Sequence, residues 1–337
     1  MKIAYILYPD VIISNKSNGI RSQAESWANV LTEAGHNVDY INNWGNYTWT
    51  DYDVIHIYGG GRWAESVARR ISAINPFVVI SPIVDPIPDF SYRKAFIKNK
   101  LSVLSRGLIA SNHLDYAEAF KYTKKILVRS SFEAKFINKV YNVPFNKIEI
   151  IRLTYSGSCQ SKYITFNKDP FCLHISSISQ PRKNVLRLIE AAKKYNFKLV
   201  LAGNPGTVEQ YAPLKNAIGN NPNIEVLGYI SEEQKIDLYR AAKVFALPSI
   251  EEGVGIVALD AAFYGCNIVI TSIPGPKEYY MGNCIECDPF DVDSIGESIK
   301  SFIDEKKNFQ PMLSEFVAKE YSFEVLRNNL VSLYSNL

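Results

Sequence analysis

Short apolar segments alternate with amphipathic segments along most of the chain. The apolar segments have the length of buried strands, and Gly, Pro, Asn or Asp residues usually follow them. In the first half, strands are expected at 3–8, 37–41, 54–58, 77–83, 108–111, 125–129 and 148–152. In the second half they are expected at 171–177, 198–203, 224–229, 243–247, 267–271 and 284–287. Mainly apolar strands separated by helices predict parallel sheets covered on both faces, and hence two doubly wound α/β domains.

Helical spacing of apolar residues fills most of the intervals between these strands. The main helices are expected at 20–34, 92–106, 131–141, 184–195, 207–218, 291–307 and 322–335. Two more are expected in the second half, one that begins at 231 and one that ends at Gly265. Residues 154–169 show no strong periodicity and have the polar composition of a linker. The predicted organisation is therefore a domain at 1–153, a linker at 154–169 and a second domain at 170–321.

The stretch 243–265 combines a strand, an acidic turn, a glycine loop and a helix. Gly253 and Gly255 would let the backbone approach a ligand closely, and the helix after them would direct free N–H groups towards it. Phosphate is the natural occupant of such a site. Glu252 and Asp260 lie on either side of the loop, where their carboxylates could accept hydrogen bonds from sugar hydroxyls.

This stretch resembles the donor-site motif of family-4 glycosyltransferases with the GT-B fold. The residues that match the motif are Pro248, Ser249, Glu252, Gly253, Gly255, Leu259 and Ala261. Two positions depart from it: Val254 stands in place of the usual Phe, and Asp260 in place of the second Glu.

A second segment, 179–185, follows the strand at 171–177 and resembles the part of the family that binds the donor diphosphate. Lys183 aligns with the family's Lys, whereas Ser177 occupies the place of its Arg, so Arg182 is expected to take over that role. A leaving diphosphate gains negative charge, which cations stabilise. A merely solvated helix start is the other interpretation, but cations at a helix N-terminus are electrostatically disfavoured.

The resemblance implies a GT-B enzyme with a cleft between two facing domains, and helix 322–337 packed back on the first. It implies retaining transfer of a hexosyl or N-acetylhexosaminyl group from a nucleotide-diphosphate sugar, without metal or other cofactor. The catalytic residues would be Glu252, Lys183 and Arg182. Donor-binding residues would be Gly19 in the first glycine loop, Tyr229 beside the base, Gly253, Val254, Gly255 and Ile256 at the phosphates, and Asp260 at the ribose.

The acceptor would be a glycan or a lipid-linked sugar of bacterial surface polysaccharide assembly, bound by the first domain. Relatives place a histidine near the end of the strand at 77–83, and this chain has none there. Asp85 is the candidate acceptor-binding residue, although an Asp before Pro is also typical of a plain turn. Two other functions stay open: a GT-B sugar-nucleotide epimerase and a non-catalytic nucleotide-sugar-binding protein.

Charge is distributed unevenly, since residues 86–152 hold thirteen Lys/Arg against five Asp/Glu, a net charge of +8 within a total of +3. Such a basic region suggests an anionic partner. We expect residues 92–125 to dock on an anionic membrane surface through the apolar stripe of Ile97, Leu101, Leu104 and Leu108, unless that stripe packs on the sheet.

The expected location is the cytoplasm, peripheral to the inner membrane face. Met1–Asp10 has the pattern of a strand and not of a signal peptide, and no apolar run approaches the ~20 residues of a membrane span. Nucleic acid is not an expected partner.

Metal sites are not expected. Asp51-x-Asp53 opens a strand, Asp291-x-Asp293 begins a helix, and Cys284 and Cys287 fit core packing in a short strand.

Overall fold

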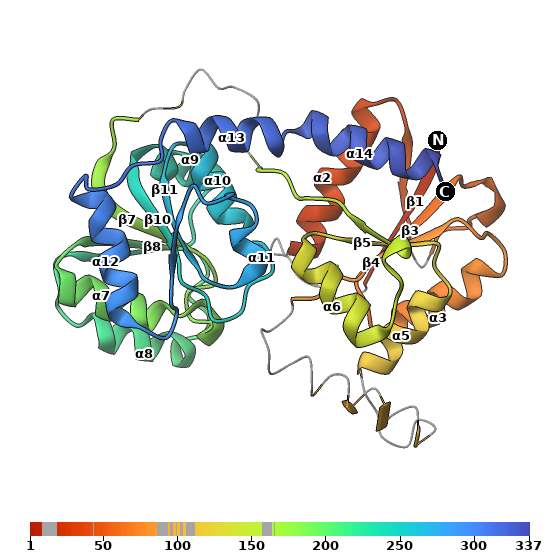
Figure 1. Ribbon diagram of the computed structural model, residues 1–337, viewed down its shortest axis with the longest axis horizontal. Coiled ribbons are helices and arrows are strands. Elements are labelled where there is room, and N and C mark those ends of the chain that lie inside the picture. The colour runs from red at the N-terminus through yellow and green to blue at the C-terminus, as the bar shows by residue number, and fades with distance from the viewer. Residues whose placement is uncertain are drawn as a thin grey trace. The chain divides into compact units, whose positions relative to one another are not determined.

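The computed structural model describes residues 1–8, 19–42, 44–85, 112–156 and 166–337, together with residues 94, 97, 98, 100, 101, 104, 105 and 164. The chain forms two compact units (Figure 1). Unit 1 comprises Met1–Thr154 and Phe323–Leu337, and unit 2 comprises Tyr155–Ser322. Each unit contains a six-stranded parallel sheet flanked by helices, which confirms the prediction of two Rossmann-like domains.

The strands of unit 1 follow the order β2-β1-β3-β4-β5-β6. They are β1 (Lys2–Leu7), β2 (Asn37–Tyr40), β3 (Val54–Tyr58), β4 (Val78–Ser81), β5 (Lys125–Val128) and β6 (Ile148–Ile150). β3 and β4 are buried at every position, as expected for inner strands covered on both faces.

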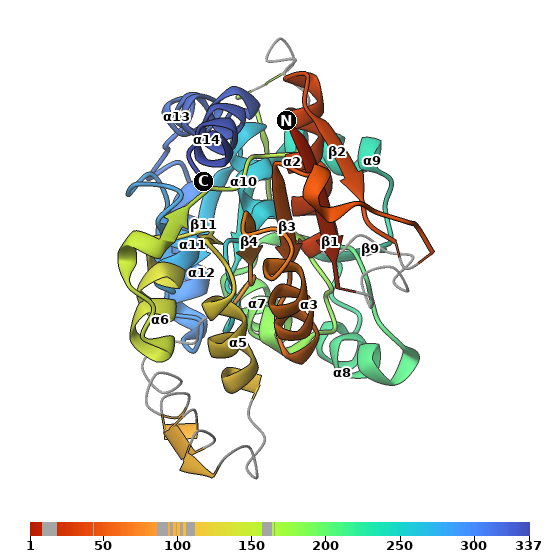
Figure 2. The same ribbon diagram turned by 90° about the vertical axis from the view of Figure 1, so that its right-hand side faces the viewer.

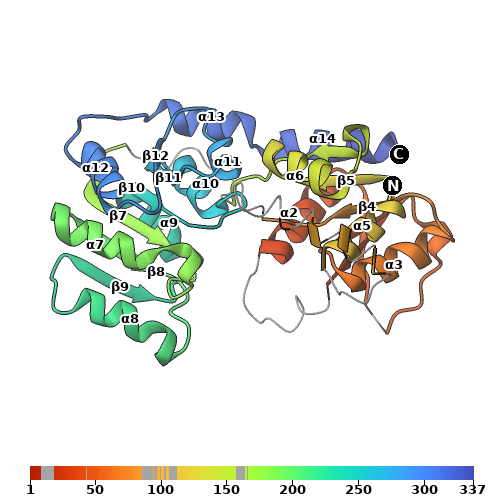
Figure 3. The ribbon, with the colours of Figure 1, turned by 60° about the horizontal axis from the view of Figure 1, so that its bottom comes forward.

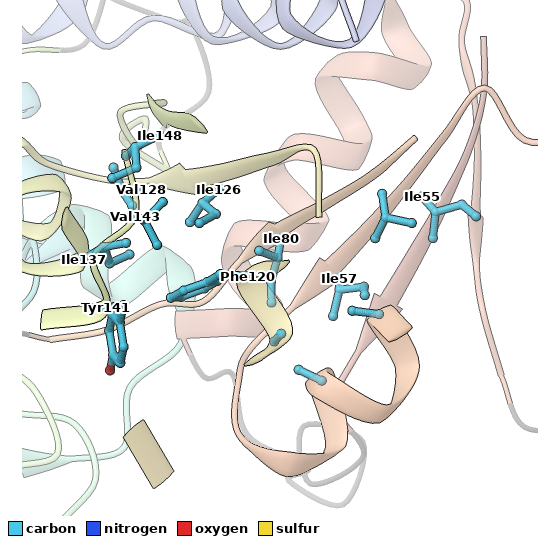
Figure 4. Packing of buried hydrophobic residues seen from close by; sticks show 14 of the residues in the cluster. Ile55, Ile57, Ile80, Phe120, Ile126, Val128, Ile137, Tyr141, Val143 and Ile148 are labelled. Atoms are coloured by element: carbon cyan, nitrogen blue, oxygen red, sulfur yellow. The ribbon is translucent and has the colours of Figure 1, made fainter. Parts of the chain in front are cut away.

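Helices cover both faces of this sheet (Figures 1 and 2). They are α2 (Gly19–Glu33), α3 (Arg62–Ser72), α5 (Asn112–Lys121), α6 (Ser131–Tyr141) and α14 (Phe323–Ser335). One apolar core forms where strand residues such as Ile57, Ile80 and Val128 meet Phe120 of α5 and Ile137 of α6 (Figure 4).

α14 returns to unit 1 and packs beside α2 (Figure 1). A fully buried histidine connects it to the sheet: His56 Nδ1 lies 2.6 Å from the Tyr334 hydroxyl, and His56 Nε2 lies 2.8 Å from Ser81 Oγ. Burial lowers the pKa of His56, so the imidazole is neutral and one nitrogen donates while the other accepts. The hydrogen bonds of His56 thus join α14, β3 and β4.

We expect Tyr334→Phe to lower the free energy of unfolding by about 1–2 kcal/mol. The substitution keeps the ring but leaves a buried imidazole nitrogen without its partner, which costs more than the lost bond alone. Chemical denaturation measures this difference. Phe323→Leu at the start of the same helix is the control, and an equal loss in both variants would contradict the role given to the hydroxyl.

The strands of unit 2 follow the order β12-β11-β10-β7-β8-β9. They are β7 (Asp169–Ile175), β8 (Lys198–Ala202), β9 (Ile224–Gly228), β10 (Ala242–Leu247), β11 (Asn267–Thr271) and β12 (Ile285–Cys287). From β7 the chain proceeds outward through β8 to β9 and then returns to β10 on the other side of β7. The order of strands therefore reverses between β7 and β10.

The helices of unit 2 lie on both faces of its sheet (Figure 3). They are α7 (Val185–Tyr195), α8 (Val208–Ile218), α9 (Glu232–Ala241), α10 (Ile256–Phe263), α11 (Pro274–Lys277), α12 (Val292–Ile303) and α13 (Met312–Glu320). α7, α8 and α12 share one apolar core. α9 and α13 both contact α10.

Three expectations differ from the structure or fall outside it. The helix expected at 291–307 ends at Ile303, and Glu305 takes a left-handed conformation two residues later. α13 was not predicted; Leu313 and Val317 bury one face of it, and Ser314 Oγ donates to the carbonyl of Phe263. The strand expected at 108–111 and much of the helix at 92–106 lie outside the described residues.

Candidate functional site

The two segments singled out in the sequence meet at the carboxyl ends of β7 and β10. Parallel doubly wound sheets bind ligands where the strand order reverses, because the loops on either side diverge and leave a crevice. Here the Ile250 N–H donates to the carbonyl of Arg182 at 2.8 Å, which joins the loop after β10 to the loop after β7. Residues about seventy positions apart in sequence are therefore neighbours.

Lys183 and Glu252 form an ion pair at this place, with Lys183 Nζ 2.5 Å from Glu252 Oε2. Each residue is only 9% exposed, and the Ser249 hydroxyl donates to the same carboxylate oxygen at 3.2 Å. Because both charges are nearly buried, removing either one would leave the other without compensation. The two expected catalytic residues are thus coupled to each other.

Asn184 holds the surrounding loops together. Its backbone is left-handed (φ 61°), a conformation that Asn tolerates better than most residues. Its side-chain amide donates to the carbonyls of Pro248 and Pro289 at 2.9 and 2.6 Å. Arg187 Nη1 donates to its Oδ1 at 2.9 Å. Sequence reasoning missed this residue, because its partners lie in two distant loops.

His174 of β7 is hydrogen-bonded to β10 and so joins the two central strands of unit 2. Its Nδ1 lies 2.8 Å from the carbonyl of Ala246, and its Nε2 lies 2.7 Å from Ser176 Oγ. Burial, aided by the positive charge of nearby Lys183, lowers the pKa of His174 to about 4, although the hydrogen bond to the Ala246 carbonyl opposes this shift. The ring is therefore neutral, and since a carbonyl only accepts, Nδ1 carries the proton and Nε2 accepts from Ser176.

Gly255 forms the N-cap of α10. Its φ of 74° favours glycine, and a Cβ there would lie 2.7 Å from Leu247 Cδ2. The chain's own packing therefore accounts for this glycine. Val254 is 3% exposed, so its side chain belongs to the core, while the half-buried Ile256 begins the helix. Gly253 is buried in the same loop.

Asp260 lies inside unit 2 on α10 and is 2% exposed. The Ser156 N–H donates to its Oδ1 at 2.5 Å. Burial raises the pKa of Asp260 to about 6, although the hydrogen bond from Ser156 opposes this shift. In this structure the carboxylate expected to bind ribose is hydrogen-bonded to the start of the segment expected as a linker.

The remaining expected site residues, the catalytic Arg182 and the donor-binding Tyr229 and Gly19, are more exposed. Arg182 donates through Nε to Gln180 Oε1 at 3.1 Å and through Nη1 to the carbonyl of Glu251 at 3.4 Å. Tyr229 is 56% exposed, and its hydroxyl donates to Asn204 Oδ1 at 2.6 Å. Gly19 is the exposed first residue of α2 in unit 1.

A cavity of about 640 Å³ opens beside these loops. Its walls come from the loops after β7, β8 and β10 and from residues of α7 and α8. Ser177, Ser179, Asn204 and Ile250 line it, but Lys183 and Glu252 do not. The candidate site is the ion pair, where two opposite charges are nearly buried together, whereas the charged residues that line the cavity are Arg187 and Glu209.

Asp85, the expected acceptor residue, follows β4 in unit 1. Its carboxylate is 42% exposed and accepts a hydrogen bond from Arg129 Nη2 at 2.9 Å. Arg129 also donates to Glu133 Oε2 at 3.0 Å and to the carbonyl of Val84 at 2.8 Å. Glu133, 1% exposed, accepts the Val84 N–H at 2.8 Å. The loop that carries Asp85 is thus held by a buried charged network that the sequence did not reveal.

The acidic and cysteine pairs rejected as metal sites have structural partners. Asp53 accepts the Lys2 N–H, Asp291 caps α12 by accepting the Asp293 N–H, and Asp293 pairs with Lys194. Burial raises the pKa of both Cys284 and Cys287 to about 12, which disfavours the thiolate that a metal would need. Within the described ranges, no three His, Cys, Asp or Glu side chains converge as metal ligands.

Comparison with known proteins gives one family match, over residues 160–319, to the family described as glycosyl transferases group 1. The O-antigen chain mannosyltransferase B of Escherichia coli is 26% identical over 243 residues, which are 65% of this chain and 62% of that protein. The O-antigen chain mannosyltransferase RfbU of Salmonella typhimurium is 24% identical over 212 residues, 61% of this chain and 58% of that protein. The chain therefore spans less than two thirds of these relatives.

Solved structures share the fold at lower identity. Sucrose-phosphate synthase from Thermosynechococcus elongatus has a TM-score of 0.76 at 13% identity, covering 100% of this chain and 99% of that one. HepE of Anabaena, solved in complex with UDP-glucose, has a TM-score of 0.71 at 16% identity and full coverage of both chains. Among the described residues, no helix is both long and apolar enough to cross a membrane.

Proposed function

Because the chain belongs, over residues 160–319, to the glycosyl transferases group 1 family, we propose that it transfers a sugar from a nucleotide-diphosphate sugar to a hydroxyl. The observation that carries the proposal is the Lys183–Glu252 ion pair at the strand-order reversal of unit 2. Complexes of relatives with the same fold support a nucleotide sugar as donor, since HepE was solved with UDP-glucose.

The ion pair suits a donor with a charged end and a hydroxylated end. An ammonium has three N–H donors, so Lys183 can keep its bond to Glu252 and also donate to a diphosphate oxygen. The remaining lone pairs of Glu252 would accept from sugar hydroxyls. Arg182 would share the phosphate charge, and the free N–H groups at Gly255 and Ile256 would face the phosphates.

The further donor contacts follow the resemblance. Asp260 would bind the ribose, Tyr229 would lie beside the base, and the backbone of Gly253 and Val254 would approach the diphosphate. Protein cations supply the positive charge in this proposal, so it requires no metal.

Transfer would proceed with retention of the anomeric configuration. The bond from the anomeric carbon to the leaving phosphate oxygen breaks while the acceptor oxygen bonds to the same face of that carbon. The acceptor's proton passes to the departing phosphate oxygen, so the step needs no protein nucleophile. Lys183 and Arg182 offset the charge that grows on the diphosphate.

The acceptor would be a glycan or a lipid-linked sugar of bacterial surface polysaccharide assembly. Two relatives bear names of O-antigen chain mannosyltransferases, which supports a hexosyl donor, with N-acetylhexosamine as the other candidate. Asp85 would accept a hydrogen bond from the acceptor, since its carboxylate is exposed and oriented by Arg129.

Attachment to an anionic membrane on its cytoplasmic side is part of this proposal. The apolar stripe of the basic region is not covered at its described positions: Ile97, Leu101 and Leu104 are 54%, 45% and 78% exposed. Lys94, Lys98 and Lys100 are exposed as well. Each basic residue close to an anionic surface contributes about 1 kcal/mol, enough in combination for reversible attachment.

Co-sedimentation with vesicles of graded anionic lipid content tests this part. We expect binding to rise with anionic lipid and to fall strongly when Lys94, Lys98 and Lys100 are all changed to Glu. Vesicle binding that does not depend on the anionic lipid content, or that persists in the triple variant, would favour an acceptor free in solution.

A panel of radiolabelled UDP- and GDP-sugars tests the reaction itself. We expect nucleotide release from one donor, slow with water and faster with a glycan acceptor, and a product of unchanged anomeric configuration by NMR. Epimerised nucleotide sugar would indicate an epimerase, and tight binding without release would indicate a binding protein.

A further inference from the structure

We propose that unit 1 carries a second carbohydrate site, along its edge strand β2, that binds a neutral hexopyranose unit of a glycan. The inference deepens the proposed function and rests on it in one respect, the assumption that the glycan is the acceptor. The site is a pocket of about 460 Å³ beside β2, the edge strand of the sheet.

The pocket lies between β2 and the segment that connects it to β3. β2 contributes Asp39 and Tyr40, and the connecting segment contributes Asn46, Tyr47, Thr48 and Asp51. Aromatic faces suit the C–H groups of a pyranose ring, whereas carboxylate, amide and hydroxyl groups suit its hydroxyls. A pocket that combines both kinds of group has the composition that sugar recognition requires.

The carboxylate of Asp39 is held in place from inside the unit. The hydroxyl of Tyr52, a residue only 4% exposed, donates to Asp39 Oδ2 at 2.9 Å. Burial, together with this bond to Asp39, raises the pKa of Tyr52, so the phenol keeps its proton and stays the donor. Lys2 Nζ lies 4.6 Å from the centre of the same ring. Asp39 is therefore oriented before any ligand arrives.

The backbone of β2 offers further groups at the pocket. The N–H groups of Asn37 and Ile41 donate inward to the carbonyls of Met1 and Tyr5. Since backbone groups alternate along a strand, those of Val38 and Tyr40 face away from β1. An edge strand leaves such groups available to a ligand.

The connecting segment also presents a tryptophan to solvent. Trp44 is 96% exposed, and its N–H donates to Asn42 Oδ1 at 2.9 Å. The Tyr47 hydroxyl accepts the Asn42 N–H at 3.0 Å and sits against Gly45, where a Cβ would lie 2.3 Å from it. The turn that carries Trp44 is therefore tied to a pocket residue. Its indole face would stack on a sugar next to the one in the pocket.

Charge selects among possible ligands. Lys2 contributes one positive charge to the lining, and Asp39 and Asp51 contribute two negative charges. A surplus of negative charge disfavours phosphate groups and nucleic acid, whereas carboxylates accept well from sugar hydroxyls. The lining therefore favours a neutral glycan.

Affinity electrophoresis in gels that contain mannan or dextran tests the site. No nucleotide sugar is present, so a failure of the transferase proposal would not affect this measurement. We expect mannan or dextran to retard the wild-type chain. Trp44→Ala and Asp51→Asn should each weaken retardation about tenfold, as truncation of an anchoring contact does. Trp44→Tyr should restore most of it.

Phe145→Ala, at another exposed aromatic of unit 1, is the matched control and should match the wild type. The proposal would be overturned if neither polysaccharide retards the wild type, or if Trp44→Ala and Asp51→Asn migrate as the wild type does. Retardation by a phosphorylated mannan alone would also overturn it, since the lining would then bind anions.

Discussion

Lys183→Met is expected to lower the rate of sugar transfer by about 10²–10³-fold, the usual effect of removing one preorganised charge-stabilising contact. The ammonium is the group best placed to offset charge on the leaving diphosphate, because it is nearly buried at the strand-order reversal and already fixed by Glu252. Glu252→Gln should have a comparable effect, since the carboxylate both orients Lys183 and accepts from the sugar. Steady-state kinetics with the donor found in the panel measures both.

Stability must be separated from activity in these variants. The pair is nine-tenths buried, and breaking a fully buried pair costs about 3–5 kcal/mol. Because the Lys183–Glu252 pair is slightly exposed, breaking it should cost less free energy than breaking a fully buried pair. Lys183→Met/Glu252→Gln removes both charges, so it should recover stability but not transfer. Lys243→Met breaks an ion pair with Glu305 elsewhere in unit 2 and should leave transfer unchanged. Near-normal transfer in a well-folded double variant would contradict the site.

Asp260→Asn is expected to stabilise the fold at pH 7 and to weaken nucleotide binding. The folded-state pKa of about 6 lies above the ordinary value of about 3.9, so the folded state binds more protons between these values. Stability due to this group therefore falls as pH rises from about 4 to 6. The neutral amide avoids the cost of a buried charge and can still accept from Ser156, which predicts a gain of about 2–3 kcal/mol at pH 7.

The same substitution removes a charged hydrogen-bond acceptor from the proposed ribose site. We expect nucleotide affinity to fall by about 1–3 kcal/mol. Denaturation at pH 4 and pH 7 and calorimetry with UDP and GDP measure the two effects. Asp237→Asn, at an exposed residue of α9, is the control and should change neither. Lower stability at pH 7 in Asp260→Asn would show that the carboxylate is stabilising in its charged form.

Most of the fold could be predicted because strand burial and helix amphipathicity leave a local pattern. The strand expected at 243–247, apolar from Val244 to Leu247, corresponds to β10, and the helix expected at 131–141 corresponds to α6 with the same ends. α13 was missed because only Leu313 and Val317 mark its buried face strongly, and its partner α10 is distant in sequence. Elements defined by long-range packing leave the weakest local signal.

The candidate site residues came from the glycine loop with its flanking carboxylates and from the family resemblance, whereas their mutual contacts could not be predicted from the sequence. Lys183 and Glu252 were recognised from separate motifs, but nothing local showed that they bond to each other. Asn184 and His174 were not predicted for the same reason, since each is hydrogen-bonded to a backbone carbonyl of a loop or strand that is distant in sequence. Gly255 was expected to contact the ligand, and this stays a prediction; its positive φ and the nearness of Leu247 Cδ2 also favour glycine there for reasons of packing.

Calorimetric titration of nucleoside diphosphates into the wild type and Lys183→Met/Glu252→Gln tests the central claim most directly. The double variant lacks both site charges but should remain folded, so a difference in affinity reports on the site itself. We predict that UDP or GDP binds the wild type and that the double variant binds it about 10- to 100-fold more weakly, as the loss of a charged hydrogen bond implies. Equal affinity in the two proteins would place the diphosphate elsewhere and contradict the account.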